Sequence, residues 1–160
     1  VTLSLIISIL VGINGFISSS TTLVNSHSSS DFLTFYSAAR MIYQSQNANL
    51  YNLSAQSAIQ HTIVPMMDNK NYSPYFYPPF LLLFFLPISG LSLLFAYIAW
   101  TIINIIFIGI ICTIVFKKRP LVKFFILLLV VFSFPPVLYS LLLGQTAIIL
   151  TFIFFITAGG

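Results

Sequence analysis

The stretch that decides the fold is LSLLFAYIAWTIINIIFIGIICTIVF, residues 91–116, a nearly unbroken apolar run without a charged side chain. About 20 apolar residues are enough for a helix to cross the hydrocarbon core of a bilayer. Because the run is continuous and does not alternate between apolar and polar residues, it favours a helix over a barrel strand. It predicts a transmembrane helix, and with it an integral membrane protein.

The composition of the whole chain supports the same prediction. Of its 160 residues 59% are hydrophobic and 5% are charged, against roughly 25% charged residues in typical soluble domains. The net charge of +4 does not indicate a nucleic-acid partner. Four of the six basic residues lie within residues 117–123, between two apolar runs, where basic residues set the orientation of a membrane protein.

Cysteine and histidine usage points to no metal centre. The single cysteine, Cys112, lies in an apolar run and excludes an internal disulfide. His27 and His61 are far apart in the sequence and have no acidic or cysteine partner at ligand spacing. We therefore expect no bound cofactor, and the sequence leaves open whether a divalent metal is required.

The other apolar runs outline one polytopic, all-α membrane domain over residues 1–160. Residues 1–17 form a first span, residues 18–77 form an extracytoplasmic loop, and residues 78–160 hold further membrane helices. The last apolar run, from Thr146, ends before a full span is complete, so we expect the chain to be incomplete at its C-terminus.

Two interfacial helices are predicted in the loop. In the first, apolar residues recur at helical spacing on one face, namely Phe32, Phe35, Tyr36, Ala39, Ile42 and Tyr43. Polar residues fall largely on the other face, namely Thr34, Ser37, Arg40 and Gln44. This pattern is typical of an amphipathic helix on a membrane surface. A second helix is expected to begin at a Ser54 cap and to run to about Val64, before Pro65.

The topology leaves an alternative open at the short apolar run of residues 79–89. Basic residues favour the cytoplasmic side, which places residues 117–123 inside. With residue 31 outside, this orientation requires the short run to dip into the membrane without crossing it. The alternative is that the run crosses fully and the basic segment lies outside.

Asp31 opens the first loop helix and is one of only two acidic residues in the chain. A carboxylate is costly near a bilayer, so an acid beside a membrane span is a candidate for function. The residue pattern leaves a second role open, because an acid directly after Ser28–Ser30 also stabilises the N-terminus of a helix.

An ordered set of short motifs then resembles glycosyltransferase family 87. The motifs are Asp31-Phe32, Tyr36 with Ala38-Ala39-Arg40, Leu50-Tyr51, Tyr77-Pro78-Pro79, Pro135-Pro136-Val137 and Gly144-Gln145. The family consists of polytopic GT-C glycosyltransferases and includes bacterial α-mannosyltransferases that use polyprenyl-phosphate mannose. Such enzymes are considerably longer, so the chain resembles an N-terminal fragment. The usual glycine before the Leu-Tyr pair is replaced by a polar stretch around Ser45–Asn49.

The resemblance implies an inverting transfer of a hexose, mannose in the family, from a polyprenyl-phosphate donor to a lipid or glycan acceptor. It implies that Asp31 is the general base and that the enzyme is a multi-pass protein acting at the outer face of a bacterial or archaeal inner membrane. One carboxylate suffices because the lipid phosphate leaves without being protonated, unlike the leaving group of a glycosidase.

Four further residues are candidates for substrate binding. Arg40 is suited to bidentate contact with the donor phosphate, although an ideal helix places it about 13 Å from Asp31. A solvated or headgroup-binding arginine is an equal alternative. Tyr36 and Tyr77 are candidates for stacking on sugar or for interfacial anchoring. Gln145 either binds the donor or packs against another helix.

Two non-enzymatic functions compete with this interpretation. A transporter or flippase segment would use Asp31 to bind an ion or proton, but such residues usually lie near mid-membrane in a broken helix. A structural membrane subunit would make the ordered motifs a coincidence.

Overall fold

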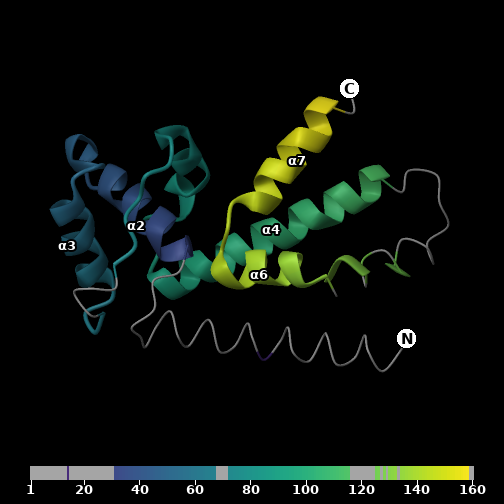
Figure 1. The fold of residues 1–160 in the computed structure, drawn as a ribbon, viewed down its shortest axis with the longest axis horizontal. Coiled ribbons are helices and arrows are strands. Elements are labelled where there is room, and N and C mark those ends of the chain that lie inside the picture. The colour runs from purple at the N-terminus through teal and green to yellow at the C-terminus, as the bar shows by residue number, and fades with distance from the viewer. Residues whose placement is uncertain are drawn as a thin grey trace. The chain divides into compact units, whose positions relative to one another are not determined.

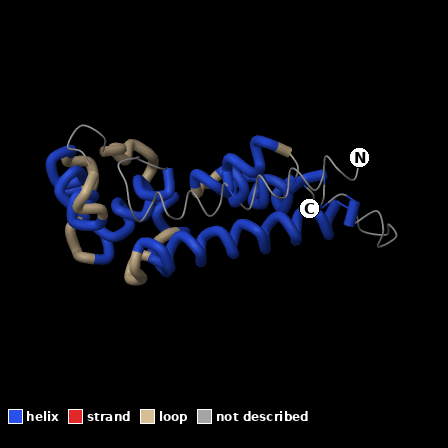
Figure 2. Tube along the Cα trace, turned by 90° about the horizontal axis from the view of Figure 1, so that it is seen from below, coloured by secondary structure: helices blue, strands red, loops and turns tan. Residues whose placement is uncertain are grey.

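A computed structural model describes residues 14, 31–67, 72–115, 125, 126, 128, 130–132 and 134–158. These residues form helices joined by loops and include no strand (Figure 2). The predicted all-α class is confirmed for this part of the chain. The chain divides into two compact units, which we call the first unit (described residues between 31 and 100) and the second unit (described residues from 101 onward).

The first unit is built around α2, Asp31–Tyr43, with α3 beside it (Figure 1). The helix itself was predicted, but its two faces differ from the prediction. Thr34 and Ser37, assigned to the polar face, are buried, whereas Tyr43, assigned to the apolar face, is 64% exposed. The polar side is buried because its hydroxyl groups have partners: Thr34 donates to the carbonyl of Ser73, and Ser37 to that of Thr34. We therefore describe α2 as the central helix of this unit and not as a helix with one face open to water.

α2 ends in a Schellman motif. The N–H of Gln46 donates to the carbonyl of Met41 at 2.8 Å, and the N–H of Ser45 donates to that of Ile42 at 2.9 Å. Ser45 takes the left-handed conformation, with φ of 62°, where glycine is usual. A short 3-10 helix, η1 (Asn47–Asn49), follows, as expected from an asparagine-rich interruption.

α3, Leu53–Ile63, confirms the second predicted loop helix but not its cap. The capping residue is Asn52 and not Ser54: its Oδ1 accepts a hydrogen bond from the N–H of Ala55 at 3.1 Å. The helix stops at Val64, directly before Pro65, which cannot continue it.

Two glutamines of α3 hold an extended segment against the helix. The side chain of Gln56 accepts from the N–H of Tyr75 at 2.6 Å and donates to its carbonyl at 3.2 Å. Gln60 does the same at Ser73, at 3.1 and 2.7 Å. The spacing of the two glutamines matches that of their partners, since four residues of a helix rise about 6 Å and two residues of an extended segment span about 6.6 Å. Each buried glutamine side chain therefore bonds both the N–H and the carbonyl of one residue, as the backbone of a neighbouring strand does in a sheet.

Residues 79–88 form two 3-10 helices, η2 (Pro79–Phe84) and η3 (Leu86–Ile88). Pro79 and Pro87 stand in their first turns, where a residue without an N–H is tolerated. The single helix expected here is thus replaced by two 3-10 helices, while the predicted dip into the membrane stays a prediction. Leu82 and Phe85 are fully buried and attach this segment to the first unit.

α4, Leu93–Val115, is the helix predicted from the opening stretch. Its 23 residues give a length of about 34 Å, which exceeds a hydrocarbon core of about 30 Å. Among the described residues it is the one continuous helix long and apolar enough to cross a membrane.

In the second unit, α6 (Pro135–Leu143) and α7 (Ala147–Ala158) are separated by a sharp bend of 117°. Neither helix is long enough to span a bilayer alone, so the pair is either one broken span or a re-entrant element. The structure therefore supports one crossing, or two if the pair crosses, and the predicted polytopic arrangement stays a prediction. The predicted first span (residues 1–17) and the basic segment (residues 117–123) lie outside the described residues, except for residue 14.

Candidate functional site

Asp31 lies at the start of α2, where the core of the first unit meets its surface. Its side chain is partly exposed, whereas the next residue, Phe32, is completely buried. Asp31 is also the only acidic residue in the part of the chain that the structure describes. The first turn of a helix favours negative charge, because unpaired N–H groups point toward it. The position therefore suits both roles left open by the sequence, helix stabilisation and proton acceptance.

An aromatic cluster around Phe32 fixes the start of α2. The Phe32 ring stacks on Tyr36 at 5.7 Å and meets Tyr97 edge-on at 5.3 Å. Phe85 contacts Phe32 at 6.1 Å and stacks on Trp100 at 3.9 Å. Closely packed rings resist rotation. The backbone that carries Asp31 is thus held by its neighbour, which is the kind of support that a positioned base needs.

Arg40 has partners within the first unit. Its Nη1 donates to the hydroxyl of Tyr36 at 2.8 Å and to the carbonyls of Ser89 and Leu91, both at 3.1 Å. The Tyr36 hydroxyl in turn donates to the Leu91 carbonyl at 2.7 Å. Burial raises the pKa of Tyr36, while the charge and the hydrogen bond of Arg40 act in the opposite direction. The group fastens α2 to the turn that leads into α4.

This arrangement separates Arg40 from Asp31. The two residues lie near opposite ends of α2, about 13 Å apart on an ideal helix. Tyr36, predicted as a sugar contact, is 1% exposed and offers no open ring face. The structure thus brings Tyr36 and Arg40 together with each other, but it does not bring Arg40 to Asp31.

Tyr77 belongs to an aromatic shelf on the surface of the first unit. It is 47% exposed and packs on Phe35 at 4.9 Å and on Tyr75 at 5.7 Å. Tyr51 extends the shelf: its ring stacks on Tyr75 at 6.3 Å, and its hydroxyl donates to the carbonyl of Tyr77 at 3.0 Å. Burial raises the pKa of Tyr75, and neighbouring Tyr51 and Tyr77 add to this shift. The exposed rings of Tyr51 and Tyr77 are therefore backed by a rigid inner layer.

Gln145 lies at the bend of the second unit. Gly144 ends α6 in the left-handed conformation, with φ of 67°, and the N–H of Gln145 donates to the carbonyl of Ser140 at 2.9 Å. The Ser140 hydroxyl donates to Oε1 of Gln145 at 3.2 Å. These bonds close the bend as a second Schellman motif and hold the glutamine side chain against α6.

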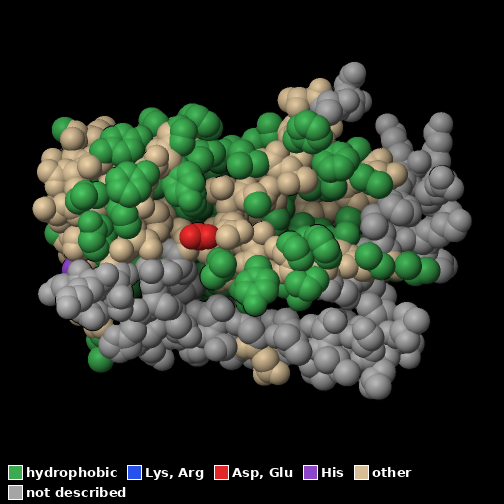
Figure 3. All heavy atoms as spheres, in the orientation of Figure 1, with side chains coloured by type: hydrophobic (Ala, Val, Ile, Leu, Met, Phe, Trp, Pro, Cys, Tyr) green, Lys and Arg blue, Asp and Glu red, His purple; other side chains and the backbone are tan. Residues whose placement is uncertain are grey.

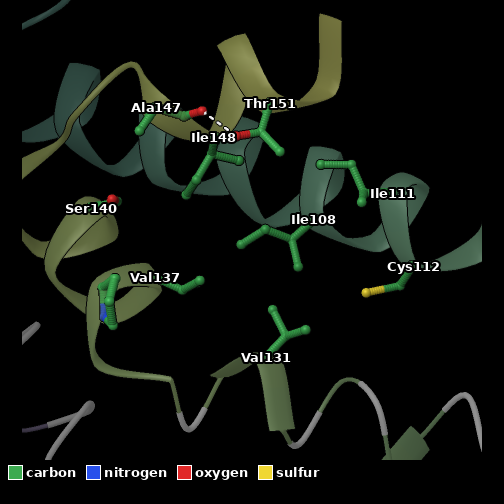
Figure 4. A pocket seen from close by; sticks show the side chains of 10 residues that line it. Ile108, Ile111, Cys112, Val131, Val137, Ser140, Ala147, Ile148 and Thr151 are labelled. Atoms are coloured by element: carbon green, nitrogen blue, oxygen red, sulfur yellow. Dashed lines mark hydrogen bonds between the residues drawn. The ribbon is translucent and has the colours of Figure 1, made fainter. Parts of the chain in front are cut away.

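A cavity of about 220 Å³ opens in the second unit, between α4, α6 and α7. Ile108, Val131, Val137 and Ile148 point into it (Figure 4). The hydroxyl of Thr151, on the same wall, donates to the carbonyl of Ala147 at 2.8 Å. The lining is therefore apolar in character, and none of the predicted site residues belongs to it.

Among the described residues, no group of three or more His, Cys, Asp and Glu side chains comes together.

A model of glycosyltransferase family 87 matches residues 75–158, which is more than half of the chain. The chain belongs to glycosyltransferase family 87. No match was found among curated proteins or among solved structures.

The family 87 match includes Tyr77 and Gln145 but begins after Asp31, Tyr36 and Arg40. It supports glycosyltransferase activity, while the roles of individual residues stay predictions. Sequence reasoning missed the supporting glutamines, Gln56 and Gln60. Their only signal was a spacing of four residues in a helix, which places both amides on one face.

Proposed function

We propose that this family 87 chain carries the general base, Asp31, of an inverting membrane glycosyltransferase. The donor is a polyprenyl-phosphate hexose, with mannose as the sugar, and the acceptor is a lipid or glycan. The reaction takes place at the outer face of a bacterial or archaeal inner membrane, with the chain as a multi-pass protein in the bilayer. The observation that supports the proposal is the position of Asp31, a partly exposed carboxyl group beside a locked aromatic core in a chain of this family.

In this mechanism Asp31 accepts the proton of the acceptor hydroxyl as its oxygen attacks the anomeric carbon. The lipid phosphate departs from the opposite face with the bonding electrons, so the configuration inverts. Exposed Tyr77 is the candidate for contact with sugar, and Gln145 for contact with the donor. Arg40 enters as a positioning residue, because its Nη1 already contacts Tyr36 and two backbone carbonyls.

The test is Asp31→Asn in the full-length protein. Asparagine keeps the shape of the side chain and can still accept a hydrogen bond, but it cannot accept the proton. We expect sugar transfer to fall by about 10² to 10⁴-fold, the range for loss of a general base. The free energy of unfolding should change by no more than about 1 kcal/mol, which is the contribution that a charged side chain makes at a helix terminus.

The matched control is Asp68→Asn, the same change at the other acidic residue of the chain. It should transfer sugar at the wild-type rate. Wild-type transfer by Asp31→Asn would reduce Asp31 to a helix-stabilising residue and remove the catalytic assignment.

The transporter alternative receives limited support from the bend between α6 and α7, since broken helices line transport sites. The bend carries the neutral Gln145 and no ionisable side chain. Family 87 membership favours the enzyme.

A further inference from the structure

The segment from Pro79 to Ile88 has two apolar sides, only one of which the first unit covers. Side chains three residues apart share a side of a 3-10 helix. On the inner side Leu82 and Phe85 are completely buried. On the outer side Phe80 and Leu83 are 59% and 65% exposed. We call Phe80 and Leu83 the outer stripe.

The surroundings of the outer stripe are also apolar. Phe76 before it and Leu91 and Phe95 after it are exposed, and residues 72–100 contain no charged side chain. Figure 3 shows hydrophobic side chains spread over the described part of the face it draws, among other side chains and backbone. Contiguous exposed apolar patches of this kind are uncommon on surfaces that face water and mark contact with lipid or with a partner.

Several backbone N–H groups of this segment are satisfied within it, as contact with hydrocarbon requires. Unpaired N–H groups are excluded from a bilayer core because water cannot satisfy them there. The N–H groups of Leu81, Phe85 and Ile88 each donate to the carbonyl three residues earlier. The three prolines within residues 78–87 have no N–H to satisfy.

We propose that the outer stripe contacts lipid acyl chains, so that residues 79–88 dip into the leaflet in which α4 begins. This inference rests on the membrane setting of the proposed function. Lipid is the favoured occupant because the stripe continues, within a few residues, into α4, the helix that is long and apolar enough to cross the bilayer. Residues 44–49 of the same unit are exposed and, apart from Ala48, polar, so we expect them to face water.

The dipping segment is a rigid anchor for the candidate site. Phe85, on its inner side, stacks on Phe35 of α2 at 5.1 Å with an interplanar angle of 10°. Phe85 also contacts Phe32, the neighbour of Asp31. The depth of the segment in the leaflet therefore sets the height of the start of α2, which suits an enzyme whose donor sugar is tethered to a lipid.

The experiment places a fluorescent label at the outer stripe of the full-length protein in phosphatidylcholine vesicles. Cys112 and every cysteine outside residues 1–160 are first replaced by alanine, and Leu83→Cys then carries an environment-sensitive nitrobenzoxadiazole label. We expect lipids with a doxyl group on the acyl chain to quench this label, and aqueous iodide to leave it unquenched. Asn47→Cys, at an exposed polar position, is the matched control and should show the reverse.

Quenching of the Leu83 label by iodide would overturn the proposal, because the stripe would then face water. Quenching by neither agent would also overturn it, because protein, from this chain or from a second copy, would then cover the stripe. Both labelled variants must first give the wild-type circular dichroism spectrum. Fluorescence requires no turnover, so its result is independent of the Asp31→Asn assay.

Discussion

Ser45 and Gly144 occupy the same place in two Schellman motifs, but only one of them is glycine. Both have positive φ, 62° and 67°, a region that costs an L-residue about 1 to 2 kcal/mol. The resemblance to family 87 had already indicated a missing glycine around Ser45–Asn49. Ser45 lies at the start of that stretch, and there a residue with a Cβ holds a strained position after α2.

We therefore expect Ser45→Gly to raise the free energy of unfolding by about 1 kcal/mol, by removing the left-handed strain. Gly144→Ala should lower it by a similar amount. Chemical denaturation in detergent micelles measures both changes. A loss of stability in Ser45→Gly would contradict the assignment of strain to Ser45.

Arg40 offers a second prediction at this scale. Arg40→Lys keeps the positive charge but loses the planar guanidinium that reaches three acceptors. We expect the free energy of unfolding to fall by about 1 to 3 kcal/mol, the range for hydrogen bonds to a charged group. The losses in free energy of unfolding caused by Tyr36→Phe and by Arg40→Lys should not add in the double variant, because the two side chains share a hydrogen bond.

If Arg40 instead bound the phosphate of the donor, Arg40→Lys would have a different effect. Arg40→Lys would then raise the KM for the donor while the free energy of unfolding stayed at the wild-type value. Denaturation curves and donor-dependent kinetics on the same preparation separate the two roles.

At the scale of elements, α2 shows why a helix was predictable while its surroundings were not. Spacing along the chain identified the helix and its apolar residues. Burial of Thr34 and Ser37 depends on partners 23 to 39 residues away, Gln60 and Ser73, that helical periodicity does not reveal. A polar face is exposed only if no other element satisfies its hydrogen bonds.

The pairing of α3 with the extended segment is testable through Gln60. Gln60→Leu keeps most of the side-chain volume but leaves the partly buried N–H of Ser73 without its partner and leaves the Ser73 carbonyl with Thr34 as its hydrogen-bond donor. We expect a loss of about 1 to 3 kcal/mol in the free energy of unfolding. Hydrogen exchange at the Ser73 amide should become faster, because its protecting bond is gone.

Gln46→Leu is the matched control, since the same change at an exposed side chain should leave both measurements near wild type. Unchanged exchange at Ser73 in Gln60→Leu would show that the amide pairing does not hold the segment.

At the scale of the whole molecule, buried tyrosines link stability to alkaline pH. Burial raises the pKa of Tyr36 and of Tyr75 above the ordinary value of 10.0. Above that pH the unfolded chain loses these protons while the folded chain keeps them, so the unfolded state binds fewer protons. The free energy of unfolding should therefore fall as the pH rises above about 10.

Tyr75→Phe should reduce the steepness of this fall, because phenylalanine has no proton to lose. Tyr43→Phe, at an exposed ring, is the control for the same chemical change. Denaturation curves between about pH 8 and about pH 11 provide the comparison. Equal slopes in wild type and Tyr75→Phe would contradict a contribution from the buried hydroxyl.

The amino-acid sequence by itself determined the helical class, the long apolar helix α4 and the two loop helices, because apolar content and periodicity are local properties. The ordered motifs also led to family 87, with Asp31 as its candidate base. Only the tertiary structure decided that Tyr36 is buried, that Arg40 joins α2 to the turn before α4, and that Gln56 and Gln60 pair with an extended segment. These facts depend on which groups meet across long stretches of chain, since a polar side chain is satisfied by whatever partner the fold brings to it.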